Sequence, residues 1–173
     1  MKSCLCILIC FLWIACSDRA PDKKRNLVRT GFEVKVKHST GDPFEKQIDT
    51  VKYKFLPYIG NVARLKNFDQ CQLEFLILAQ HIRRNHDLIV VPIGILEFSE
   101  MGVKQKVIIS VPENVDIRSI SVDNYEEFVL KFFGVQQIIE NWYHHRLGFG
   151  MVRDIRWDNE LSAIRNIEAC MQN

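Results

Sequence analysis

Residues 69–78 read DQCQLEFLIL, and this stretch decides which fold the chain can adopt. It passes from a polar turn into the apolar run Leu73 to Ala79, which has the length of a buried strand. Two similar runs follow, Leu88 to Leu96 and Val107 to Val111. Polar or turn residues bound each run, so the sequence predicts buried strands at the centre of the domain.

On the amino-terminal side of this stretch, the sequence predicts one more strand and two turns. Residues 32–37 read FEVKVK, and this strict alternation of apolar and polar residues is typical of a half-buried strand. Gly41 to Pro43 and Pro57 to Gly60 contain the residues that favour turns.

On the carboxyl-terminal side, the pattern changes to that of a helix. Asp123 begins a capping box with Glu126, and apolar residues follow at helical spacing as far as Trp142. Gly148 and Gly150 are expected to end this helix.

A second helix is expected to begin at Asp158. Strands first and helices last predict an α+β domain, a small barrel with helices packed outside it. The expected apolar face of the second helix consists of Leu161, Ile164, Ile167 and Met171.

Composition excludes several classes of protein. The chain has 173 residues, of which 25% are charged, and its formal net charge is +2. These values are typical of one globular domain and exclude collagen-like or wholly disordered chains. No basic stripe interleaved with aromatic residues is present, so the sequence argues against nucleic-acid binding.

The first residues indicate export. Lys2 precedes an apolar run, Cys4 to Ala15, which is too short to span a bilayer and has the form of a signal peptide. The run ends in Leu12-Trp13-Ile14-Ala15-Cys16, which resembles the lipobox of bacterial lipoproteins. The alternative is a plain signal peptide with a chance cysteine.

The lipoprotein interpretation divides the chain into three parts. Residues 1–15 form the signal peptide, residues 16–30 form a tether lipid-anchored through Cys16, and residues 31–173 form the domain. The protein is then expected in the cell envelope, outside the cytoplasm and held on a membrane. Cys71 and Cys170 remain as thiols, and they can form a bridge in an oxidising compartment, which the sequence leaves open.

An ordered series of short segments carries a resemblance to a known family. In order and spacing, the segments resemble the soluble (family I) inorganic pyrophosphatases over roughly residues 32–170. The segments are residues 55–61 (FLPYIGN), 69–78 (DQCQLEFLIL), 92–96 (PIGIL), 100–102 (EMG) and 107–112 (VIISVP).

The resemblance implies a fold and an activity. It implies a five-stranded β-barrel of oligonucleotide-binding type, flanked by two C-terminal helices. It also implies Mg²⁺-dependent hydrolysis of diphosphate to two phosphates, with diphosphate or phosphate as the small-molecule partner, and assembly into a homo-oligomer.

The family's catalytic positions are only partly kept. The resemblance places metal ligands at Asp69, Glu74 and Glu100, with Gln105 at a fourth ligand position. The position of the general base falls on Cys71, so no catalytic residue is assigned. The structural alternative is that these carboxylates are solvated turn or strand-edge residues and that Cys71 is a small buried residue.

The positions that hold phosphate are also altered. The resemblance leaves Tyr58, Asn61 and Arg146 as candidates for binding substrate. Tyr58 and Asn61 have a structural alternative, which is support of a turn.

These substitutions leave open whether the chain is an enzyme. One hypothesis is a magnesium-dependent inorganic diphosphatase whose activity is weak or lost, that is, a pseudoenzyme. The other is a non-catalytic, lipid-anchored binding or scaffolding protein of the cell envelope.

Overall fold

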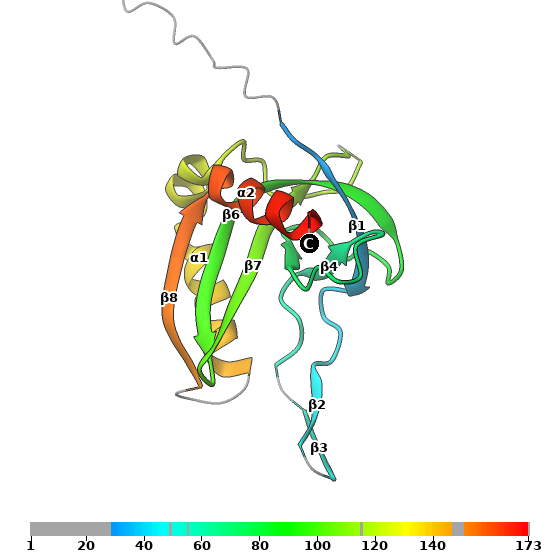
Figure 1. Ribbon diagram of the computed structural model, residues 1–173, viewed down its shortest axis with the longest axis vertical. Coiled ribbons are helices and arrows are strands. Elements are labelled where there is room, and N and C mark those ends of the chain that lie inside the picture. Colours follow the sequence, from blue (N-terminus) through cyan, green and yellow to red (C-terminus); the bar gives the residue numbers. More distant parts are fainter. Residues whose placement is uncertain (1–28, 49, 55, 115, 147–150, 173) are drawn as a thin grey trace, which may run out of the picture.

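The computed structural model describes residues 29–48, 50–54, 56–114, 116–146 and 151–172. The expected signal peptide, Cys16 and most of the expected tether lie outside these residues. Figure 1 shows how the elements are arranged. In chain order they are β1 (Phe32–His38), β2 (Glu45–Ile48), β3 (Val51–Lys54), β4 (Asn61–Leu65), β5 (Glu74–Ile77), β6 (Asp87–Glu100), β7 (Val103–Pro112), α1 (Tyr125–Arg146), β8 (Val152–Asn159) and α2 (Glu160–Met171).

Five strands pair in a closed ring. β1 pairs with β4, β4 with β5, β5 with β7, β7 with β6, and β6 returns to β1. The β5–β7 pair is parallel and the others are antiparallel, so the sheet is mixed. β8 extends the sheet along β6, while β2 and β3 form a separate hairpin that projects from the body (Figure 1). The expected α+β class is confirmed, and the oligonucleotide-binding type stays an interpretation.

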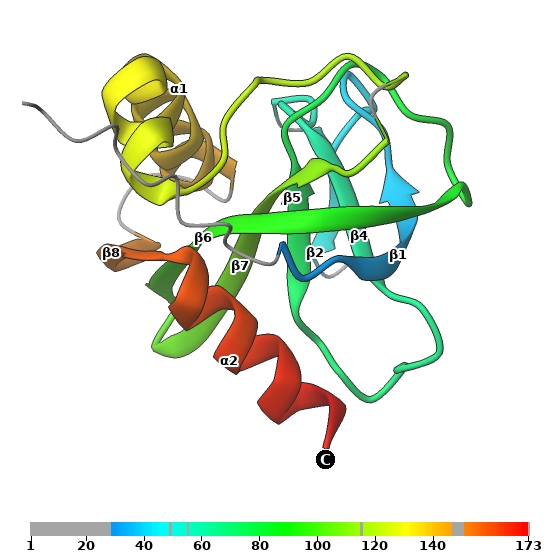
Figure 2. The ribbon, with the colours of Figure 1, turned by 90° about the horizontal axis from the view of Figure 1, so that it is seen from above.

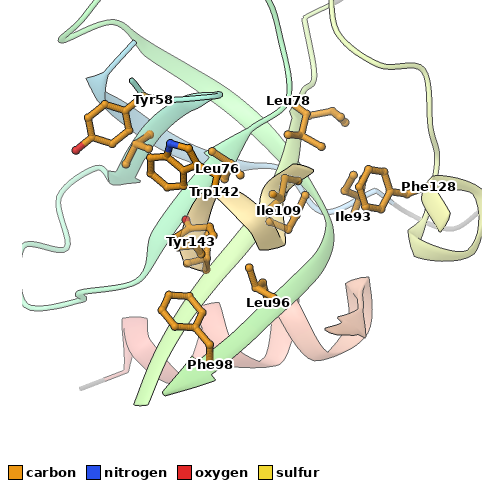
Figure 3. Packing of buried hydrophobic residues seen from close by; sticks show 14 of the residues in the cluster. Tyr58, Leu76, Leu78, Ile93, Leu96, Phe98, Ile109, Phe128, Trp142 and Tyr143 are labelled. Atoms are coloured by element: carbon orange, nitrogen blue, oxygen red, sulfur yellow. The ribbon is translucent and has the colours of Figure 1, made fainter. Parts of the chain in front are cut away.

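Two hydrophobic clusters form the core, one on each face of the sheet. Alternation along β5 sends Leu76 into one cluster and Phe75 and Ile77 into the other, as the period of a strand requires. α1 covers the first cluster with Ile139 and with Phe128, Trp142 and Tyr143, which Figure 3 labels, and α2 covers the second. Figure 2 shows the two helices on opposite sides of β6 and β7.

The helix predicted after Asp123 is present as α1, with a cap one residue later than expected. The Asn124 side chain accepts from the backbone N–H of Glu127 at 2.8 Å, and the Glu127 carboxylate accepts from the N–H of Asp123 at 2.6 Å. α1 ends at Arg146, and the glycines expected to end it lie outside the described residues.

The apolar face predicted for the second helix is wrong at its two ends. Leu161 is 54% exposed and Met171 is 37% exposed, whereas Ala163 and Ile167 are buried. The strand β8, which the sequence analysis missed, runs up to Asn159, whose side chain caps α2 by accepting from the N–H of Ser162 at 3.1 Å. This cap satisfies one of the free N–H groups at the start of α2.

A disulfide joins the loop before β5 to the end of α2. Cys71 and Cys170 are bonded, with their Cα atoms 5.4 Å apart. The bridge left open by the sequence is therefore present. None of the helices in the described ranges has both the length and the apolar character needed to cross a membrane.

Candidate functional site

Two adjoining cavities lie where β1, β4, β5 and the last turn of α1 meet. The first has a volume of about 440 Å³. Three basic residues and two carboxylates line it, so the cavity carries a small excess of positive charge. Its lining residues are Lys37, His38, Tyr58, Val62, Arg64, Leu65, Phe68, Asp69, Cys71, Glu74 and Arg146.

The second cavity, of about 200 Å³, lies beside the first and reaches the β6–β7 hairpin. It shares Arg64, Glu74 and Arg146 with the first cavity and adds Glu100 and Gln105. Glu74 and Arg146 therefore lie at the border between the two cavities. This border is the candidate site.

A partly buried polar cluster forms this border. Tyr143 Oη donates to Glu74 Oε1 at 2.9 Å, and Arg146 Nη1 donates to the same oxygen at 3.3 Å. The last turn of α1 brings Tyr143 and Arg146 onto one face because residues three apart are neighbours on a helix. Burial, and then the negative charge of Glu74, hold the pKa of Tyr143 well above its usual value. The phenol therefore stays protonated and acts as a donor.

Aromatic rings surround the Arg146 guanidinium. Its central carbon lies 5.0 Å from the ring centroid of Phe44, 5.3 Å from that of Trp142 and 5.4 Å from that of Tyr143. Such cation–π contacts stabilise a partly desolvated cation. Burial lowers the pKa of Arg146, but the neighbouring Glu74 carboxylate raises it, and the net shift is upward. Arg146 is a permanently charged group at the site.

His38 and Tyr58 form part of the wall of the first cavity. Their rings stack with centroids 4.5 Å apart. Burial, followed by the positive charge of Arg84, lowers the pKa of His38, so the imidazole is neutral at pH 7. Burial raises the pKa of the Tyr58 phenol. The wall is therefore aromatic and uncharged, and Tyr58 lies at the cavity as the sequence predicted.

The residues predicted to bind metal are divided between the cavities. Asp69 lines the first, Glu100 and Gln105 line the second, and Glu74 lines both. Within the residues that the structure describes, no three or more histidine, cysteine, aspartate or glutamate side chains group so as to hold a metal ion. Glu74 already faces a guanidinium, which opposes a divalent cation at the same carboxylate. The arrangement therefore opposes Mg²⁺ at Glu74, and metal binding by the predicted residues stays a prediction.

Cys71 stands where the family resemblance places a general base. It is 2% exposed, lines the first cavity and is bonded to Cys170. A disulfide sulfur has no proton to exchange and no basic lone pair near neutral pH, so it cannot act as a base. The expectation of a small buried residue at this position is confirmed, and the sulfur is also a covalent link.

Asn61 lies away from both cavities. Its Oδ1 accepts from the N–H groups of Thr40 at 3.2 Å and Ile82 at 2.9 Å. Its Nδ2 donates to the carbonyls of Ala79 at 3.3 Å and Gln80 at 2.9 Å. The side chain is fully buried and these bonds use its hydrogen-bonding capacity. These contacts agree with the structural alternative to substrate binding, in which Asn61 supports the chain around a turn.

Sequence reasoning missed two groups at the site. Tyr143 follows Trp142 in the apolar stripe of α1, and its role as a donor to Glu74 depends on a contact 69 residues away in sequence. Arg64 lines both cavities, but it lies in β4, a strand that the sequence analysis did not predict. The available signal was the single charged residue Arg64 among the apolar residues Val62, Ala63 and Leu65.

No protein-family model matches the sequence, and no curated protein matches it. Solved structures do match. The inorganic pyrophosphatase from Thermus thermophilus superposes with a TM-score of 0.64 at 14% identity, over 88% of this chain and 93% of that one.

Two further solved pyrophosphatase structures also match this chain. The N-terminal-domain-truncated vacuolar soluble pyrophosphatase of Trypanosoma cruzi, solved in complex with PPi, matches with a TM-score of 0.67 at 10% identity, over 88% of this chain and 72% of that one. An inorganic pyrophosphatase from Coxiella burnetii matches with a TM-score of 0.56 at 14% identity, over 80% and 92%. The arrangement of strands and helices in this chain is therefore the inorganic pyrophosphatase fold.

Proposed function

We propose that this chain is a protein of the inorganic pyrophosphatase type whose diphosphatase activity is weak or lost and whose site binds diphosphate or phosphate. The fold and the family resemblance of residues 55–112 support the pyrophosphatase type. The observation that carries the weak or lost activity is the disulfide at Cys71, in the position expected to hold the general base.

Hydrolysis of diphosphate needs a proton acceptor for the attacking water and positive charge on the leaving phosphate. Loss of a general base alone costs about 10²–10⁴-fold in rate. Gln105 brings a neutral amide to a position where the family resemblance expects a carboxylate, and Glu74 is paired with Arg146. These changes act on the same step, so we expect their effects to combine.

Phosphate release from diphosphate in millimolar magnesium tests the proposal. With the Thermus thermophilus enzyme measured alongside, we expect turnover lower by about 100-fold or more. Turnover within tenfold of that enzyme would contradict the proposal.

A gain-of-function variant sharpens this test. Cys71→Asp combined with Gln105→Asp restores two carboxylates, and we expect turnover to rise above that of the natural chain. Cys71→Asn combined with Gln105→Asp is the matched control, because it also breaks the disulfide and differs only in the carboxylate at position 71. Equal turnover of the two variants would show that position 71 does not supply the base.

A second candidate function is a lipid-anchored binding or scaffolding protein of the cell envelope. The Cys71–Cys170 disulfide favours it, because structural disulfides form and persist in oxidising compartments outside the cytoplasm. The lipobox-like segment ending at Cys16 points to the same location. The two candidates are compatible, since a protein with a weakened site can bind phosphate on a membrane surface.

A further inference from the structure

Arg146 occupies an unusual place at the border of the two cavities. Its guanidinium lines both of them, and it is held by Glu74 on one side and by the rings of Phe44, Trp142 and Tyr143 on the other. These contacts fix its position. A fixed guanidinium loses little conformational freedom when it binds an anion.

The Arg146 guanidinium has N–H donors that Glu74 does not engage. Only Nη1 is engaged by Glu74, and the buried Nε has no hydrogen-bond partner among the residues that the structure describes. A guanidinium presents five N–H donors in a planar fork, which matches two oxygens of a phosphate group. Nε is shielded from solvent, so an anion in the cavities must accept from the terminal nitrogens of the fork.

The surroundings favour an anion over a divalent cation. Arg64 lines both cavities beside Arg146, and Lys37 lines the first, so three cations face Asp69 and Glu74 there. Glu74 has its positive partner already in Arg146. A divalent cation at Glu74 must therefore displace or repel the guanidinium.

We propose that Arg146, positioned by Glu74 and Tyr143, binds a phosphate group directly and without a divalent metal ion. The inference rests on the proposed function in that it concerns the same site, and it adds the mode of binding. Arg146 is the binding residue, and Glu74 and Tyr143 are positioning residues. The positive charge that a metal ion brings to diphosphate is supplied here by a side chain.

Calorimetric titration of the purified full chain with inorganic diphosphate and with inorganic phosphate tests the inference. One series contains a chelator and the other contains millimolar magnesium. We expect binding in the chelator, with an affinity for inorganic phosphate within about threefold of that in magnesium. Binding of both anions only when magnesium is present would overturn the inference, as would no binding in either series.

Substitutions at Arg146 test the fork geometry. Arg146→Lys keeps the charge but loses the planar pair of donors, so we expect its affinity in the chelator to fall by about tenfold or more. Arg153→Ala removes an exposed arginine of β8 and is the matched control, for which we expect no change. Unchanged affinity of a folded Arg146→Lys variant would overturn the inference. If that variant does not fold, the chelator series on the natural chain still decides.

The positioning role of Glu74 is tested separately, by comparing the anion affinities of two variants at this position. Glu74→Gln keeps an oxygen that can accept from Arg146 and Tyr143, whereas Glu74→Ala does not. We expect the glutamine variant to retain more anion affinity than the alanine variant at equal unfolding midpoints. Equal affinities would contradict the positioning role.

Failure of this inference and failure of the proposed function give different results. Magnesium-dependent binding without turnover refutes only the inference. Turnover close to that of the Thermus thermophilus enzyme refutes the proposed function whatever the binding mode.

Discussion

The Asn61 side chain connects β4 to two separate segments through four hydrogen bonds inside the protein. We expect Asn61→Ala to lower the free energy of unfolding by about 2–4 kcal/mol, because the buried N–H of Ile82 loses its partner, at about 1–3 kcal/mol, and three partly buried backbone groups lose theirs at a smaller cost. Chemical denaturation measures the change. Gln70→Ala, at an exposed polar residue, is the control, and its effect should stay within about 0.5 kcal/mol.

The same variant distinguishes the two roles considered for Asn61. A structural role predicts that Asn61→Ala, while still folded, keeps its affinity for phosphate. Reduced phosphate affinity at unchanged stability would show that Asn61 takes part in binding phosphate.

Individual site residues could be predicted from the sequence only in part. Tyr58, Asp69, Glu74 and Arg146 line one cavity, whereas Glu100 and Gln105 line the other, so the candidate residues are brought together only in part. Asn61 belongs to the same segment as Tyr58, yet a bend at Ile59 and Gly60 separates them, and the Asn61 side chain has a different set of partners. The partners of a polar side chain depend on loops whose path no local pattern specifies.

The disulfide between the loop before β5 and α2 is a contact between two elements that a single substitution tests directly. Cys170→Ser opens a covalent loop with a sequence separation of 99 residues. We expect the free energy of unfolding to fall by about 2–4 kcal/mol, because the unfolded chain regains conformational freedom. Denaturation with and without a reductant measures this loss.

Reductant provides the internal control. The natural chain should lose stability in reductant to the level of the serine variant, and the variant itself should not respond. An unchanged free energy of unfolding of the natural chain in reductant, with its thiols shown to be free, would contradict a stabilising role of the bridge.

The strands β1, β5, β6 and β7 and both helices could be predicted, whereas β2, β3, β4 and β8 could not. β1 alternates apolar and polar residues, α1 has apolar residues at helical spacing, and β5, β6 and β7 fall on short apolar runs of the length of a buried strand. β8 has one buried residue, Val152, in an otherwise exposed or half-exposed run. Its extended form depends on pairing with β6, which is a contact between distant parts of the sequence.

For the whole molecule, the proposal of a lipid anchor makes a direct prediction. The full chain should incorporate a fatty-acid probe and should fractionate with membranes, whereas Cys16→Ser should do neither. Cys170→Ser is the matched control, since it removes a different cysteine and should keep the label. Equal membrane association of the natural chain and the Cys16→Ser variant would contradict the anchor.

The disulfide between Cys71 and Cys170 also has a consequence for how the protein matures. Beyond the expected signal peptide the sequence contains three cysteines, which can pair in three ways. If Cys16 carries the proposed lipid, the thioether removes that sulfur from disulfide exchange. A single pairing then remains, so oxidation has one product and no isomerase is needed to correct it. In this view, the lipid that holds the protein on a membrane also protects its thiols from incorrect pairing.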